Sequence, residues 1–138
     1  MNKPTGRIIA VAAGACAFAL AGVLFAQAPG IQRTIVAKAD VSVPGREAVV
    51  ASVEIAPGGV ADWHTHPGDE ATLVIQGEIE VFMAGKPAHT YKGGEGFVIP
   101  AGTVHSAKNH ATAPVKLAGV YFVEKGKPLA SPAPAPAQ

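Results

Sequence analysis

The sequence predicts an all-β domain, either a sandwich or a barrel, and three observations support this prediction. Beyond residue 30 the apolar residues show no helical periodicity. Short runs of apolar and β-branched residues follow one another instead, and glycine or proline stands at the end of most runs. Strands at such short and regular spacing are typical of β-sandwiches and barrels.

The turn signals separate the expected strands. Glu47–Ile55 ends at a Pro-Gly-Gly turn, and Glu78–Met83 shows the two-sided pattern of a half-buried strand, with Ile79, Val81 and Met83 on one face and glutamates on the other. The remaining strands are expected at Ala71–Gln76, Ala88–Lys92, Phe97–Ile99, Val104–His110 and Val115–Val123. Together they place one domain at residues 29–125, which suits a chain of 138 residues.

Residues 1–28 are predicted to be a signal peptide or an N-terminal anchor. Lys3 and Arg7 precede an apolar run over residues 8–26, and Ala26-Gln27-Ala28 resembles a signal-peptidase site. Because Pro29 is unfavourable directly after a cleavage site, cleavage after Ala26 and retention of residues 8–26 as a membrane anchor are alternatives. We expect a periplasmic or secreted protein, with a membrane-anchored protein facing the periplasm as the alternative.

Composition excludes several classes of function. The chain has 11 basic and 10 acidic residues, and loss of Lys3 and Arg7 leaves 9 against 10, a net charge of −1. Without a basic patch, nucleic-acid binding is not expected. Cys16 lies in the apolar segment, so the mature domain has neither a disulfide nor a cysteine nucleophile. No nucleophile elbow or phosphate-binding glycine loop is present either.

Residues 126–138 are predicted to be a largely disordered tail. From Gly126 onward proline and alanine alternate, and this composition supports neither a strand ladder nor a packed core.

Four side chains have spacings that fit one metal site. His64 and His66 are two residues apart, so both imidazoles leave the same face of an extended strand. A Pro-Gly turn can bring Glu70 back beside them, and His105 follows the Pro100–Gly102 turn. Three imidazoles and one carboxylate suit one divalent transition metal ion: Fe, Mn, Ni, Cu or Zn.

The two segments resemble the signature motifs of the cupin superfamily. Gly58, His64, His66, Glu70 and Gly77 fill the first motif, and Gly94, Pro100, Gly102, His105 and Asn109 fill the second. The resemblance covers roughly residues 33–123 and implies a single jelly-roll β-barrel. It also implies that His64, His66, Glu70 and His105 hold one metal ion, and that the small barrel pairs into a homodimer.

Other polar residues are assigned more ordinary roles. Asp62 is interpreted as a solvated loop residue rather than a partner of His64, and His89 and His110 as surface histidines. Asn109 is interpreted as a structural hydrogen-bonding residue. Thr72, Val74 and Gln76 are expected on the same face of their strand as Glu70.

Three functions fit this reading. The first is an exported metalloenzyme with dioxygenase- or isomerase-type chemistry on a small, oxygen-rich substrate that chelates the metal. In that case Glu70 is also the catalytic residue and accepts a proton from the substrate, a role that the resemblance implies because it is suggested for some metal-dependent dioxygenases of the cupin superfamily. The second is a non-catalytic module that binds a small ligand or a metal in the periplasm. The third is a domain stabilised by a four-coordinate structural zinc ion.

Overall fold

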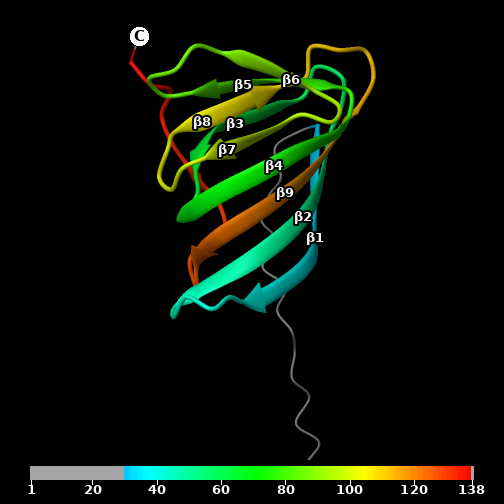
Figure 1. Ribbon diagram of the computed structural model, residues 1–138. Helices are drawn as coiled ribbons and strands as arrows, with labels where there is room; N and C mark the ends of the chain where they lie inside the picture. Colours follow the sequence, from blue (N-terminus) through cyan, green and yellow to red (C-terminus); the bar gives the residue numbers. More distant parts are fainter. Residues whose placement is uncertain (1–29, 138) are drawn as a thin grey trace, which may run out of the picture.

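The computed structural model describes residues 30–137, which fold into two antiparallel sheets without a helix (Figure 1). The expected signal peptide, residues 1–28, lies outside these residues. The first sheet has the order β1 (Ile31–Asp40), β2 (Arg46–Ile55), β9 (Val115–Glu124), β4 (Gly68–Gln76) and β7 (Gly96–Ile99). The second has the order β10 (Ser131–Pro132), β3 (Val60–Thr65), β8 (His105–Lys108), β5 (Glu78–Met83) and β6 (His89–Lys92). No helix in the described part is long and apolar enough to cross a membrane.

The all-β prediction is confirmed, but the predicted barrel is not closed. The strands form two separate five-stranded sheets, and the first ends at β7 and the second at β6. Each of these edge strands has only four residues and pairs with one neighbour within the described chain. The curved sheets therefore face each other as a sandwich (Figure 1).

The hydrophobic core lies between the two sheets. On β5, Ile79, Val81 and Met83 are buried, as the alternation of this strand predicts. From the other sheet, β9 contributes four buried side chains to the same core: Val115, Leu117, Tyr121 and Val123. The sheets thus enclose a space that functional side chains from both can enter.

The middle of the segment predicted as a tail contains a short strand. Ser131 and Pro132 form β10, which pairs with β3, and Leu129 packs against the core. The segment, red in Figure 1, is extended as expected, but it is held by contacts with the second sheet. Proline limits a ladder, and β10 accordingly has only two residues.

Asn109 has the structural role that the sequence analysis gives it. Its side chain is fully buried and its amide donates to the carbonyls of Ile55, Ala56 and Ala113 at 2.8–3.1 Å. Its amide oxygen accepts from the backbone N–H of Ala111. Asn109 therefore ties the end of β8 to the end of β2.

Replacing Asn109 by alanine is expected to lower the free energy of unfolding by about 3 kcal/mol, because several buried backbone groups lose a partner. Urea unfolding of the variant measures this loss. His110→Ala is the matched control, since His110 is exposed and its pair with Glu80 should contribute less than about 1 kcal/mol. Equal stability of the two variants would contradict this role of Asn109.

Candidate metal centre

Three histidines converge between the two sheets. His64 lies on β3 opposite His105 on β8, and their ring centroids are 4.1 Å apart. His66 follows the end of β3, with its ring centroid 4.9 Å from that of His64 and 5.0 Å from that of His105. One coordinating atom from each residue can be chosen so that all lie within 4.8 Å of one another. This group could hold a metal ion.

The turn before β8 connects the two motifs. Gly102 has a φ of 72°, which a residue with a side chain rarely adopts. Its N–H donates to the carbonyl of His66 at 3.0 Å. The turn therefore brings the strand of His105 against the loop that carries His66.

Backbone carbonyls orient all three imidazoles. Nδ1 of His64 lies 2.6 Å from the carbonyl oxygen of Asp62, and Nδ1 of His105 lies 2.8 Å from that of Thr103. Nδ1 of His66 lies 2.6 Å from the carbonyl oxygen of Leu129. A carbonyl only accepts, so each Nδ1 must carry the proton, which leaves the Nε2 lone pair of a neutral ring available to a metal.

Glu70 reaches the same place from the first sheet. It lies on β4, and its Oε2 is 2.8 Å from Nε2 of His66 and 3.6 Å from Nε2 of His105. Its other oxygen accepts a hydrogen bond of 2.6 Å from the hydroxyl of Thr72. The structure therefore brings Glu70 against His66 and His105, whereas the group whose coordinating atoms all lie within 4.8 Å of one another contains the three histidines alone among the described residues.

The donor set fits a divalent cation. Nε2 of His66 and Nε2 of His105 are buried and make no well-formed hydrogen bond within residues 30–137, although Glu70 is close. A neutral ring protonated at Nδ1 turns a lone pair toward the carboxylate, and a cation between them would make that contact favourable. Two atoms about 2.1 Å from one cation are about 3.0 Å apart at a right angle and about 3.6 Å apart at 120°. The two distances to Glu70 are close to these values.

The charge states agree with this interpretation. Burial, followed by the neighbouring His105, lowers the pKa of His64 to about 4, so this ring is neutral near pH 7. Burial alone would raise the pKa of Glu70, but its contacts with His105, His66 and Thr72 outweigh burial and hold that pKa well below its usual range. The neutral imidazole of His64 and the ionised carboxylate of Glu70 are the forms in which these groups bind metals.

These pKa shifts predict an acid-sensitive metal-free protein. The folded pKa of His64 lies below its ordinary value of 6.5, so the unfolded chain takes up the proton first as the pH falls. The free energy of unfolding should therefore fall between about pH 6.5 and 4, by at most about 3 kcal/mol. Glu70, whose pKa is also depressed, adds a further loss as the pH falls below about 4.5.

Chemical denaturation of chelator-treated protein at several pH values measures this loss. His64→Gln cannot titrate and should remove most of the slope between pH 6.5 and 4. An unchanged slope in that variant would contradict the assignment of the titration to His64.

A cavity adjoins three of the four residues predicted as metal ligands, His64, Glu70 and His105. The cavity is small, about 40 Å³, and is partly open to solvent. Arg33 and Tyr121 also line it, and the guanidinium carbon of Arg33 lies 5.8 Å from the centroid of the Tyr121 ring. Burial, and then the charge of Glu70, raise the pKa of Tyr121, so its hydroxyl stays protonated. A ligand in this cavity would meet one guanidinium and one phenol.

The sequence analysis did not identify Arg33 or Tyr121. Tyr121 could have been found, because it shares the inward face of Val115–Val123 with every second residue. Arg33 lies on β1, where most residues are exposed, so no buried pattern marks the strand.

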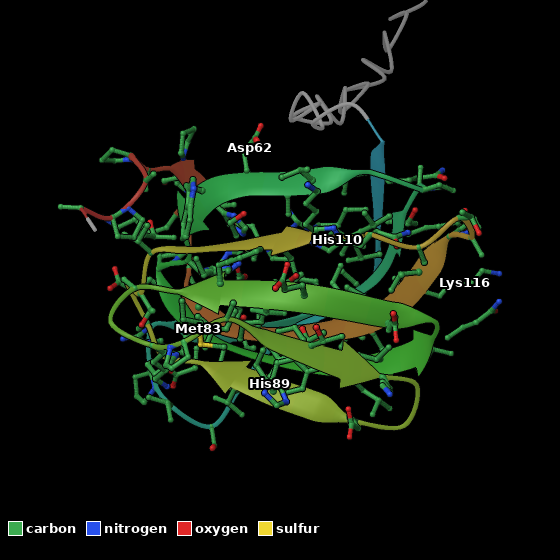
Figure 2. All side chains as sticks on the ribbon, turned by 90° about the horizontal axis from the view of Figure 1, so that it is seen from above. Asp62, Met83, His89, His110 and Lys116 are labelled. Atoms are coloured by element: carbon green, nitrogen blue, oxygen red, sulfur yellow. The ribbon has the colours of Figure 1, made fainter. Side chains whose placement is uncertain are left out.

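The remaining expectations are met in part. Thr72 is buried and lines the cavity, and Val74 is in the core. Gln76 is exposed, because the register of β4 against β9 shifts between Val74 and Gln76. Asp62 is exposed and points away from the ribbon (Figure 2). It contributes only its carbonyl oxygen to the site. His89 and His110, also labelled in Figure 2, are both exposed.

The family of the chain follows from the comparison of its sequence with known families. The cupin domain matches residues 51–124, a range that contains His64, His66, Glu70 and His105. The chain belongs to the cupin family. This confirms the resemblance that the two motifs indicate.

Two plant relatives each match about half of this cupin. Germin-like protein subfamily 2 member 2 of Arabidopsis thaliana is 39% identical over 77 residues, which cover 52% of the chain and 35% of the relative. Germin-like protein 3-1 of Oryza sativa subsp. japonica is 39% identical over 80 residues, which cover 52% of the chain and 36% of the relative. The match thus spans about a third of the length of these relatives.

Solved structures agree with the fold. KdgF from Halomonas sp. is 30% identical with a TM-score of 0.54, over 67% of this chain and 81% of that one. An oxalate oxidase is 28% identical with a TM-score of 0.56, over 69% of this chain and 51% of that one. A cupin-like protein from Thermotoga maritima has a TM-score of 0.62 at 22% identity, over 80% of this chain and 87% of that one, and this likeness concerns the fold alone.

Proposed function

We propose that this cupin is an exported mononuclear metalloenzyme. One divalent transition metal ion is held by His64, His66, Glu70 and His105. The substrate is a small, oxygen-rich molecule that chelates the metal, and the reaction is a dioxygenation or an isomerisation. The observation that carries the proposal is the set of three imidazoles whose Nδ1 atoms are held by carbonyls, which leaves their Nε2 atoms available beside a cavity open to solvent.

The chain supplies both the metal ligands and the groups that handle the substrate. A bound metal would supply Lewis acidity or redox chemistry. Glu70 is ionised, and Thr72 holds its other oxygen in place. Acceptance of a proton from a substrate hydroxyl by Glu70 requires its pKa to rise from the depressed value in the metal-free protein, because a carboxylate of very low pKa is a weak base. Tyr121 keeps its proton and can donate a hydrogen bond to a substrate oxygen.

Arg33 favours an acidic substrate. It is the only Lys or Arg side chain among the described residues that line the cavity, and guanidinium groups bind carboxylates in a planar, two-point geometry. The similarity to an oxalate oxidase supports a small carboxylate as the substrate class, because oxalate is a dicarboxylate that chelates metals. We therefore place small carboxylic acids before neutral diketones and phenols.

The alternative is a module that binds a small ligand or a metal without turnover. Most of the residues that line the cavity are apolar, which supports this alternative. Among the described residues that line the cavity, Glu70 is the only one with a carboxylate. Such a cavity can capture a ligand without further acid or base groups.

A substrate screen separates the two functions. Protein loaded in turn with iron, manganese, nickel, copper or zinc is tested for oxygen uptake and product formation with oxalate, acetylacetone and catechol. The proposed enzyme should turn over at least one of these compounds, and the alternative predicts binding alone. Retention of zinc in a four-coordinate shell, without ligand binding, would contradict both.

Arg33→Met tests the preference for acids. Loss of one charge-assisted hydrogen bond, worth about 1.5–3 kcal/mol, should raise KM for a carboxylate about 10- to 100-fold. The KM for a neutral diketone should change little. Equal effects on both compounds would show that Arg33 acts on the structure of the cavity rather than on substrate charge.

A further inference from the structure

We infer that residues Leu129–Ala133, here called the C-terminal clamp, fix the orientation and the tautomer of His66. The carbonyl oxygen of Leu129 lies 2.6 Å from Nδ1 of His66, across 63 positions in the sequence. The clamp thus connects the end of the chain to the candidate metal centre. Its effect on metal affinity rests on the proposed function, whereas its effect on the ring does not.

His66 differs from the other two histidines in the source of its partner. His64 and His105 each contact a carbonyl two residues earlier in the chain. Those partners belong to the same segment as the ring they orient, so they persist whenever the strand forms. The partner of His66 is present only when the clamp is docked.

Several contacts hold the clamp in place. Ser131 and Pro132 pair with Thr65 and His64 of β3. The N–H of Ala133 donates to the carbonyl of Trp63 at 2.9 Å. Leu129 is half-buried and packs against the core. These contacts surround the point at which the carbonyl meets His66.

Removal of the clamp would leave His66 without this acceptor. The neutral imidazole could then carry its proton on Nε2 instead of Nδ1. In that tautomer Nε2 has no free lone pair with which to bind a metal. Partners that orient a metal-binding histidine typically change metal affinity 10- to 100-fold. We therefore expect the clamp to tighten metal binding by a factor in this range.

Two truncations separate the clamp from the rest of the tail. A chain ending at Lys127 lacks the clamp, whereas a chain ending at Pro134 keeps it and lacks only residues 135–138. Ala133→Pro is a milder variant, because it removes one N–H donor and leaves the chain at full length. The Ala133→Pro variant remains informative if the chain ending at Lys127 does not fold.

Two measurements read the effect. Titration with Zn²⁺ alone should give a Kd that is 10- to 100-fold weaker for the chain ending at Lys127 and unchanged for the chain ending at Pro134. Ala133→Pro should weaken Zn²⁺ binding about three- to tenfold, as expected for one hydrogen bond. In metal-free protein, ¹⁵N shifts of the imidazoles should show Nδ1–H at His66 in the full chain and a mixture of tautomers without the clamp.

The opposite results would overturn the inference. Unchanged ¹⁵N shifts at His66 without the clamp, even with a lower Tm, would mean that the clamp only adds stability. Equal losses of zinc affinity in both truncations would assign the effect to residues 135–138. The ring measurement needs no metal, so failure of the full chain to bind Zn²⁺ would contradict the proposed function and leave the tautomer result to decide the inference.

Discussion

Replacing His66 by alanine is expected to abolish metal binding, with a loss of affinity of at least about 100-fold. His66 is buried and its Nε2 lies 2.8 Å from Oε2 of Glu70, so the substitution removes one of the three imidazoles that could coordinate a metal. Loss of an orienting partner alone costs 10- to 100-fold, and loss of the ligand itself should cost more. Metal content after dialysis, together with a Zn²⁺ titration, measures the change.

The control for this prediction is His89→Ala. His89 lies on β6, is exposed and contacts Tyr91 rather than the three converging histidines. This variant should keep the metal content of the original protein. Because His66→Ala also removes a contact of the C-terminal clamp, the chain ending at Lys127 shows how much of the loss comes from the clamp. Equal metal content in His66→Ala and His89→Ala would contradict the site.

The second large effect is expected for Glu70→Gln. Glutamine keeps the size of the side chain and removes the negative charge that a cation would contact. We expect metal affinity to fall about 10- to 100-fold, and any turnover to fall further because the amide can no longer accept a proton. Zn²⁺ titration and the substrate screen measure the two losses separately.

Thr72→Val separates the charge of Glu70 from its orientation. The hydroxyl of Thr72 donates a hydrogen bond to Oε1 of Glu70, while Oε2 of Glu70 faces the histidines. The variant should therefore weaken metal binding less than Glu70→Gln does. If Glu70→Gln bound metal as tightly as the original protein, Glu70 would not be a ligand, and a reduced turnover would then leave it only its catalytic role.

Much of the fold could be predicted because one face of most strands is buried. β5 was predicted with its observed bounds, since Ile79, Val81 and Met83 share one face of the strand and this face is covered, whereas two glutamates lie on the other face. β1 was not predicted as a ten-residue strand, because few of its residues are buried and its pattern has no apolar face. The division of the strands into two sheets depends on which strand edges pair with each other. The spacing of the strands along the sequence does not determine this pairing.

The candidate site was predictable to the extent that local spacing determines geometry. His64 and His66 leave one short segment, so their proximity follows from the sequence, and the second motif placed His105 near them. Arg33 and the Leu129 carbonyl come from the two ends of the domain. Their positions depend on the pairing of β1 with β2 and of β10 with β3, which long-range contacts determine. The clamp was therefore interpreted as disordered, although one of its carbonyls contacts a candidate ligand.

The proposed function requires one metal ion between the two sheets, bound by the converging histidines. An anomalous-difference map from crystals of metal-loaded protein, recorded at the absorption edge of the metal, tests it most directly. We expect one peak per chain, about 2.0–2.2 Å from Nε2 of His64, His66 and His105. Metal peaks only at exposed residues such as His89 or His110, with none among these three rings, would contradict it.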